Sequence, residues 1–393
     1  MERLPEEVFA RTKRLLVDLC AISSASAEPE GLRAMASRLA DELQARGLRT
    51  EIDDADGAPV LVARGPDTAN GHLLVVGHMD TVLPAIPPVL DGDRLLATGA
   101  LDMKGGLAAF IGALDLLAGR GESWPRDLLL VVVSDEEVSG VVSEAAVRRW
   151  SERARAVLVI EPGEAAGDGE TLVAGRRGLF EWRLEATGQA SHSGLAYWQG
   201  RSAVAAVAEW SVRAQSLAEP GIGPTVNVAR VLGGTAEFVD DPAQRQAMLG
   251  TSRQRNVVPD RAVAEGEARF LSAEDGERVR RSLETLTVEV GAERAVTMRF
   301  EVGLRVPPVD SRGANAEMVR RTVELAAKQG LRLSVEEDRG GISFPNYLAD
   351  PGRVPVIDGL GPVGVGMHTR EEALDLRSLA RRVVLLADLL ATL

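Results

Sequence analysis

The sequence predicts an α/β protein in which a domain with a mixed sheet flanked by helices is interrupted by a smaller α+β domain. Short apolar runs alternate with helical segments at both ends of the chain, which is typical of a sheet covered by helices on both faces. Between residues 178 and 302 the strands instead alternate apolar and polar residues, as half-exposed antiparallel strands do. With 393 residues, the chain exceeds one ordinary core.

The first part of the chain predicts helices and buried strands in alternation. Amphipathic periodicity indicates helices over 6–20 and 30–47, the second with Arg46-Gly47 as its C-cap. The predicted strands are then 73–76, 128–133 and 157–160, and the predicted helices between them are 105–118 and 141–150. Their short, uninterrupted apolar runs indicate strands that are buried on both faces.

The pattern changes near residue 175. The inserted segment has predicted strands at 178–187, 225–231, 261–271 and 296–302, with helices at 202–217 and 274–290. The α/β pattern returns after Pro307, with a helix at 314–329, a strand at 354–357 and a helix at 378–393. We therefore predict one domain built from residues 1–174 and 307–393, interrupted by an inserted domain over residues 175–306.

Composition excludes several classes of protein. A net charge of -13 argues against nucleic-acid binding. No apolar run is long enough to span a bilayer, and the N-terminal residues lack the basic and apolar regions of a secretory signal. The single cysteine, Cys20, excludes an internal disulfide and favours a reducing, cytoplasmic location. It lies on a predicted helix, where we expect a buried core thiol.

The chain contains four histidines, and two of them follow predicted strands. His78 lies beside an acidic residue, and His368 lies in a glycine-rich loop. His78 ends the run after strand 73–76, and Asp80 comes two residues later, so both side chains point the same way if strand geometry continues. The alternative is a strand-end histidine beside a solvated aspartate. His72 begins the same strand and receives no role, so its substitution should be tolerated.

Further acids follow the other predicted strands. Asp102 precedes a helix, where it either caps that helix or bridges two metals. Glu136 and Glu137 directly follow strand 128–133, at the strand end where open α/β sheets bind ligands. One glutamate there can ligate metal while the other deprotonates a water; the alternative is an acidic, solvated turn. Glu161, held by Pro162, and His368, in a glycine-rich loop, complete a set suited to two divalent metals.

In chain order these motifs resemble the M20 metallopeptidases, in particular the glutamate carboxypeptidase-like branch. The motifs are His78-x-Asp80, Gly99-x-x-Asp102-Met103-Lys104-Gly105-Gly106, Asp135-Glu136-Glu137, Glu161-Pro162 and His368. The resemblance covers nearly the whole chain, and it identifies the two-part domain as catalytic and the inserted domain as a lid and dimerisation domain. It implies a homodimer formed through the lid, and a small-molecule or dipeptide-like substrate.

The resemblance also implies a ligand set for two divalent metal ions, with Zn²⁺ expected and Co²⁺ or Mn²⁺ as alternatives. Asp102 would bridge the two ions. His78 and Glu161 would complete one metal, and Glu137 and His368 the other.

Catalytic roles follow from the same resemblance. Glu136 matches the general base that activates the water, and Asp80 matches the acid that orients His78. His192, in Ser191-His192-Ser193-Gly194, matches a histidine that reaches the partner subunit's active site and polarises the scissile carbonyl. Without the resemblance, His192 reads as a loop histidine with no role.

Substrate contacts are implied for Asn256, Arg269, Arg305 and Gly341. The arginines suit a carboxylate because their planar fork binds it bidentately, whereas surface charge is their other interpretation. One departure stands out: where the family has an aspartate after the Gly340-Gly341 loop, this chain has Phe344 followed by a proline. We expect this loop to offer backbone N–H groups in a more apolar or differently shaped pocket.

Together, these residues predict a zinc-dependent hydrolase that cleaves the amide bond of a small N-acyl amino acid or dipeptide-like substrate and releases a C-terminal amino acid. An aminoacylase, a deacetylase or a hydrolase of non-peptide amides shares the same metal site and stays open. A non-catalytic binding relative would lack the base or a ligand, and Glu136 and the five ligand candidates are all present.

Overall fold

The computed structural model describes residues 4–54, 57–138 and 140–393, and these form two compact units. Unit 1 contains the chain up to Arg176, Asp310–Arg339 and Ser343–Leu393, and unit 2 contains Arg177–Val309 and Gly340–Ile342. The boundaries expected at 174/175 and 306/307 lie close to these divisions. The short return to unit 2 at Gly340–Ile342 was not expected from the sequence.

Unit 1 is built on a six-stranded mixed sheet, as expected for the fold class. In spatial order its strands are β1 (Arg49–Asp53), β2 (Val60–Arg64), β6 (Leu128–Val133), β3 (His72–His78), β7 (Ala154–Val159) and β15 (Val356–Ile357). β6, β3, β7 and β15 run parallel, while β1 and β2 add an antiparallel edge. Every residue of β3 and β6 is buried. The carboxyl ends of the three long parallel strands therefore meet at one edge of the sheet.

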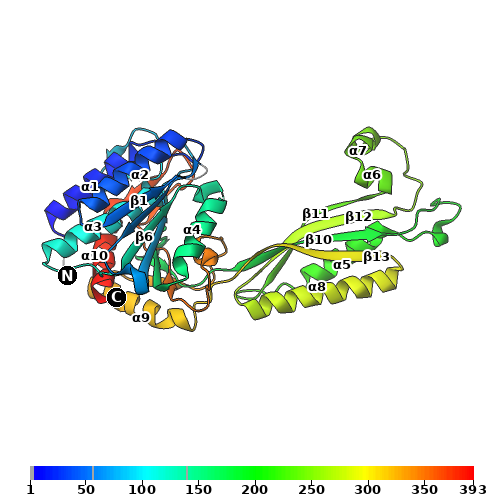
Figure 1. The fold of residues 1–393 in the computed structure, drawn as a ribbon. Coiled ribbons are helices and arrows are strands. Elements are labelled where there is room, and N and C mark those ends of the chain that lie inside the picture. Colours follow the sequence, from blue (N-terminus) through cyan, green and yellow to red (C-terminus); the bar gives the residue numbers. More distant parts are fainter. Residues whose placement is uncertain (1–3, 55–56, 139) are drawn as a thin grey trace. The chain divides into compact units, whose positions relative to one another are not determined.

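Helices cover both faces of this sheet (Figure 1). They are α1 (Glu6–Cys20), α2 (Pro29–Gln44), α3 (Gly105–Gly119), α4 (Val141–Ser151), α9 (Ala314–Lys328) and α10 (Leu376–Thr392). α3 packs against α1 and α10, and α4 packs against β6, β3 and β7. The helix expected to reach Gly47 ends at Gln44, because the chain turns into a left-handed Gly47 before β1. Cys20 is buried, as expected, and burial raises the pKa of its thiol to about 12.

Two small sheets in unit 1 escaped prediction. One contains β16 (Gly364–Val365), β17 (Ala373–Asp375), β5 (Arg94–Leu96) and β4 (Val89–Asp91); the other contains β14 (Leu333–Glu336), β9 (Gly169–Val173) and β8 (Ala165–Ala166). Strands this short carry no detectable periodicity. The β5–β17 pair is antiparallel and joins Leu95 to Leu374. It therefore brings the segment before Asp102 beside the segment after His368.

Unit 2 is an open antiparallel sheet with helices on one face (Figure 1). Its strand order is β11 (Thr225–Gly234), β12 (Arg261–Phe270), β10 (Gly178–Thr187) and β13 (Thr297–Val306). α5 (Ala203–Gln215) and α8 (Ala273–Arg294) pack on it over a core centred on Trp182 and Trp210. The short helices α6 (Ala236–Asp240) and α7 (Pro242–Met248) were not predicted. Across the described ranges, no helix has both the length and the apolarity needed to cross a bilayer.

Candidate metal centre

The sheet of unit 1 brings the predicted acids and histidines to one place. His78 is the last residue of β3, Glu136 and Glu137 open the 3-10 turn after β6, and Glu161 follows β7. Because these three strands are parallel neighbours, their following residues converge. His368 reaches the same place from the loop between β16 and β17, where it adopts a left-handed backbone conformation with φ 63°.

Asp102 lies at the centre of the cluster. Its Oδ1 is 3.1 Å from His78 Nε2, and its Oδ2 is 3.1 Å from His368 Nε2. Asp102 forms no side-chain cap on α3, so the helix-capping interpretation is wrong. Each carboxylate oxygen faces a different imidazole, which is the arrangement that a bridging carboxylate requires.

The two glutamate ligands predicted for the centre lie beside these imidazoles. Glu137 Oε2 is 3.1 Å from His368 Nε2, and Glu161 Oε1 is 3.7 Å from His78 Nε2. Two sets have ligand atoms that all lie within 4.8 Å of one another: His78, Asp102 and Glu137, and His78, Glu136 and Glu161. Glu136 is therefore close enough to ligate as well as to act as a base.

Asp80 does more than orient a histidine. The His78 Nδ1–H donates to the Asp80 carbonyl at 3.0 Å, and the Asp80 carboxylate lies 3.4 Å from the same nitrogen. The other ring nitrogen, Nε2, faces the cluster and is the one that can ligate a metal once it has lost its proton. The carboxylate also accepts the backbone N–H groups of Glu136 at 3.3 Å and Glu137 at 3.1 Å, and the hydroxyl of Ser26 at 2.8 Å. Asp80 thus fixes both the imidazole and the glutamate turn.

Asp135 lies outside the cluster. Its carboxylate accepts the backbone N–H groups of Val142 at 3.1 Å and Ser143 at 2.8 Å, in the first turn of α4. The first acid of the Asp135-Glu136-Glu137 run is therefore a helix-capping residue. It pins the turn that presents the two glutamates.

Burial and crowding disturb the ionisation of the whole cluster. Burial raises the pKa of Glu161 to about 8 and that of Glu137 to about 7, and it also raises the pKa of Glu136. The hydrogen bond to Asp102 raises the pKa of His368 to about 9. Although burial opposes it, the neighbouring Glu161 and Asp102 carboxylates hold the pKa of His78 well above its usual value. Buried carboxylates this close retain protons unless cations neutralise them.

The donor set fits divalent metals. Imidazole Nε2 atoms and carboxylate oxygens are the ligands of zinc and of other borderline or hard divalent ions. A hollow of about 10 Å³, enough for about one water molecule, borders Asp102, Glu137 and His368. The described residues thus contain groups suited to holding divalent metal.

Sequence reasoning missed Glu372, which is buried directly below Asp102. Its carboxylate accepts the backbone N–H groups of Gly99, Leu101 and Asp102 at 2.8, 2.8 and 3.0 Å. Its place four residues after His368 was the available signal, but the contact depends on the unpredicted β5–β17 pairing.

The candidates of unit 2 are exposed, except for the half-buried Arg269. The backbone N–H groups of Gly194 and Leu195 donate to His192 Nδ1, at 3.1 and 3.2 Å. His192 Nε2 lies 3.1 Å from the side-chain amide of Asn256, and a β-bridge joins His192 to Val257. The structure therefore brings His192 and Asn256 together on one exposed surface.

The other predicted substrate contacts of unit 2 differ in how they are engaged. The Arg269 guanidinium lies 2.8 Å from Glu267 and also donates to the Gly340 carbonyl. Arg305 is exposed on β13, opposite Phe180. Gly341 is exposed in the short return to unit 2.

Phe344 corrects one expectation. The ring belongs to unit 1, is fully buried, and lies 6.2 Å from the imidazole of His78, centroid to centroid. The ring packs near His78 and is not exposed, so it does not form an apolar wall that a substrate could touch.

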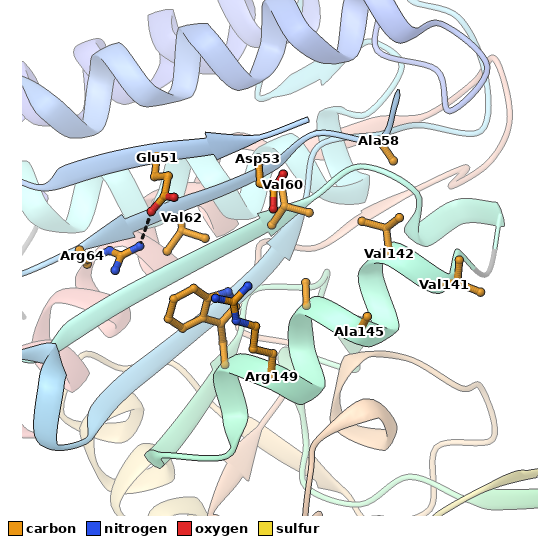
Figure 2. Close-up of a pocket in the computed structure, with 12 residues that line it drawn as sticks. Glu51, Asp53, Ala58, Val60, Val62, Arg64, Val141, Val142, Ala145 and Arg149 are labelled. Atoms are coloured by element: carbon orange, nitrogen blue, oxygen red, sulfur yellow. Dashed lines mark hydrogen bonds and ion pairs between the residues drawn. The ribbon is translucent and has the colours of Figure 1, made fainter. Parts of the chain in front are cut away.

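A second hollow of unit 1 lies away from this cluster. A groove of about 570 Å³ runs between the β1–β2 hairpin and α4, and none of the predicted site residues lines it. Figure 2 shows Val60 and Val62 of β2 opposite Ala145 and Arg149 of α4, with Glu51 and Arg64 paired at one end. Groove size is therefore a poor guide here, and the cluster of ionisable groups marks the chemistry.

Comparison with curated proteins supports the cluster's identity. Carboxypeptidase G2 of Pseudomonas sp. (strain RS-16) is 26% identical over 389 residues, covering 97% of this chain and 88% of that protein. A probable carboxypeptidase of Aspergillus terreus is 31% identical over 330 residues, covering 78% and 69%. A succinyl-diaminopimelate desuccinylase of Rhodospirillum centenum is 28% identical over 314 residues, covering 77% and 74%.

Solved structures share the fold. The aminopeptidase PepT of Bacillus cereus superposes with a TM-score of 0.77 at 21% identity, covering 98% of both chains. An M20 family metallo-carboxypeptidase of Sulfolobus solfataricus gives a TM-score of 0.65 at 18% identity, covering 97% of this chain and 98% of that one.

A family model supplies the assignment. The model of peptidase family M20/M25/M40 matches residues 74–392, a span that contains every candidate of the metal centre. The protein therefore belongs to peptidase family M20/M25/M40 and is a metal-dependent hydrolase.

Proposed function

We propose that this protein is a dinuclear zinc hydrolase that cleaves the amide bond of a small N-acyl amino acid or dipeptide-like substrate and releases the C-terminal amino acid. The observation that supports it most is the sharing of Asp102 between His78 and His368, one carboxylate oxygen to each imidazole. A single-metal site does not need this arrangement. Two proteins named carboxypeptidases among the relatives favour release of a C-terminal residue.

The proposed ligands are His78, Asp102, Glu137, Glu161 and His368. Two divalent cations held there would polarise the scissile carbonyl and make a water more acidic. Asp80 keeps the Nδ1 proton of His78 away from the ligand face and holds the backbone of Glu136 and Glu137 in place.

Glu136 is the proposed general base. It would take the proton of the attacking water and return it to the leaving nitrogen, so that the amide breaks into a carboxylic acid and an amine. Burial raises the pKa of Glu136, which makes its carboxylate a better proton acceptor than an exposed glutamate.

Unit 2 would supply substrate contacts in a homodimer. His192 Nε2–H is a donor suited to the carbonyl oxygen, and Asn256 lies beside it. We propose that a second copy of the chain delivers this pair. Arg305 and Arg269 are the candidates for the substrate carboxylate, with Gly341 offering its backbone. Arg269 would have to exchange its contact with Glu267, whereas Arg305 lies exposed on β13.

A deacylase is the second candidate. Proteins named succinyl-diaminopimelate desuccinylase are 28% and 26% identical to this chain, close to the 26% of carboxypeptidase G2. In a deacylase the same centre would remove an acyl group from a polar amine. We keep a cytoplasmic location as part of the proposal, on the single reduced and buried Cys20.

The test combines a substrate screen with a base variant. N-acyl amino acids and dipeptides that differ at either side of the amide are offered to the zinc-loaded protein. Glu136→Ala should lose at least about 10²-fold in turnover while metal content and melting temperature stay unchanged. Glu144→Ala, on the exposed side of α4, is the control and should match wild type. Near-normal turnover of Glu136→Ala would remove Glu136 from the mechanism.

A further inference from the structure

Glu372 lies at the base of the metal centre, and no role has been given to it. It is 3% exposed, and it directly precedes β17, at the end of the loop that carries His368. A fully buried carboxylate is costly unless hydrogen bonds stabilise it. Here one oxygen accepts the N–H groups of Leu101 and Asp102, and the other accepts the N–H of Gly99.

All three donors belong to the single turn that presents Asp102. The turn over Ala100–Lys104 opens α3, and the backbone at Asp102 and Met103 departs from helical geometry. The N–H groups at the start of such a turn have no carbonyl of their own to bond. Glu372 provides that acceptor from a distant segment, and its negative charge suits the N-terminal end of the helix.

The same residue is tied to the His368 loop. Its backbone carbonyl accepts the N–H of Ala97 at 3.2 Å, directly beyond the β5–β17 ladder. It lies four positions after His368, whose imidazole contacts Asp102. The side chain and backbone of Glu372 thus hold the Asp102 turn and the His368 loop together, so that Asp102 and His368 can contact each other.

We infer that Glu372 is a positioning residue that sets the placement of Asp102 between His78 and His368. The expected effect of Glu372 on metal binding rests on the proposed function. Its hydrogen bonds to the Asp102 turn do not, because they belong to the fold itself. Removing the carboxylate should let Asp102 drift from one imidazole or the other, while each ligand side chain stays present.

The variant Glu372→Gln tests this with little change of shape. The amide keeps one oxygen acceptor but replaces the other with an NH₂ group, which cannot accept the Gly99 N–H. Asp375→Asn is the matched control, because Asp375 also accepts two backbone N–H groups, those of Arg377 and Ser378 at the start of α10, and does not touch the Asp102 turn. Both variants lose a carboxylate that orders backbone in the same region.

The first readout is amide hydrogen exchange of the metal-free protein, followed in peptides that cover residues 97–104. Glu372→Gln should lose protection there, and Asp375→Asn should keep wild-type protection, because Asp375 Oδ1 accepts both of its N–H groups and an asparagine retains that oxygen. Unchanged protection at 97–104 in Glu372→Gln would overturn the inference, whatever the protein's activity.

The second readout is binding of Co²⁺, followed by its visible absorption. Glu372→Gln should bind the ion about 10- to 100-fold more weakly, the usual effect of losing a group behind a ligand, and its absorption spectrum should change. Glu372→Asp should restore part of the affinity. Wild-type affinity and spectrum in Glu372→Gln would contradict the role. Failure of the wild-type protein to bind Co²⁺ would instead refute the proposed function, and the exchange result would still decide the inference.

Discussion

In unit 1 the candidate site residues contact one another and all of them except His368 are buried or half-buried, whereas in unit 2 all of them except the half-buried Arg269 are exposed. His78, Asp80 and Asp102 are 1%, 1% and 7% exposed. The side chains of His192 and Asn256 contact each other on an exposed surface. The first group already has neighbouring ionisable groups, whereas under the proposed function the second group would gain its partners from a substrate or a second copy. The variants below test that difference.

The largest effect should come from Asp102→Ala in unit 1. The change removes the carboxylate that His78 and His368 both contact. We expect loss of bound metal and of measurable turnover, followed by metal analysis and a substrate assay. Asp91→Ala, on the exposed strand β4, is the control. Full metal content in Asp102→Ala would show that the two histidines do not share a centre.

His192→Ala should distinguish the role of unit 2 in turnover from the role of unit 1 in metal binding. Loss of one donor to the developing oxyanion costs about 10²- to 10³-fold in turnover, and metal content should stay at the wild-type level because His192 lies in unit 2. Mixing this variant with Asp102→Ala should restore part of the activity, since a hybrid dimer contains one site with both parts intact. No restoration would exclude delivery of His192 by a second copy.

A third variant addresses a buried ion pair of unit 1 outside the metal centre. Glu170 on β9 accepts from Arg382 Nε at 2.7 Å and from Arg381 Nε at 2.9 Å, and Glu170 and Arg382 are buried. Glu170→Gln leaves the Arg382 guanidinium buried without its counter-charge. We expect a loss of about 3–5 kcal/mol in the free energy of unfolding, measured by denaturant titration. A loss below 1 kcal/mol, the scale of an exposed pair, would contradict the assignment.

The same pair predicts a pH dependence. Burial opposes ionisation of Glu170, but Arg382 and Arg381 outweigh it and lower its pKa in the folded protein. Its contribution to stability is therefore complete above the unfolded-state pKa of about 4.3 and is lost as the pH falls through the lower folded-state value. Wild type should lose more stability than Glu170→Gln on acidification below that pH. Equal losses would show that Glu170 is not held ionised.

The smallest effect should come from His72, which the sequence marked as free to change. Its Nε2 contacts the Trp150 carbonyl at 2.6 Å, and the side chain is buried. His72→Ala should leave turnover unchanged but cost about 1–3 kcal/mol, because the carbonyl loses its partner. A thermal melt and an activity assay check both parts. Altered turnover would mean that a change at His72, at the start of β3, affects the position of His78 at its end.

Sequence patterns predicted the long elements and the metal-centre candidates for one reason. Buried parallel strands have uninterrupted apolar runs, and the residues that follow them meet at one sheet edge. His78, Glu136 and Glu161 could therefore be placed together from the sequence alone, and the parallel pairing of their strands agrees with this. The resemblance to a family then supplied roles for His192 and Asn256, which local patterns alone could not have done.

The missed features depend on contacts between distant residues. β5 and β17 are three residues each and carry no periodicity, yet their pairing seats Glu372 under Asp102. Phe344 read as a change in a pocket because its burial against His78 is invisible in a single sequence. Asp135 read as part of an acidic cluster, whereas its geometry makes it the cap of α4.

The pairing of β10 with β13 has a consequence for how this chain can be rearranged. Leu179 near the start of unit 2 and Val306 near its end are cross-strand partners, so the polypeptide departs from unit 1 and re-enters it across a gap of about 5 Å. A linker of a few residues would span that gap. The long segment of unit 2 thus has adjoining ends, so its length can change without moving the strands that carry the metal-ligand candidates, provided that its contact with Gly340–Ile342 is kept.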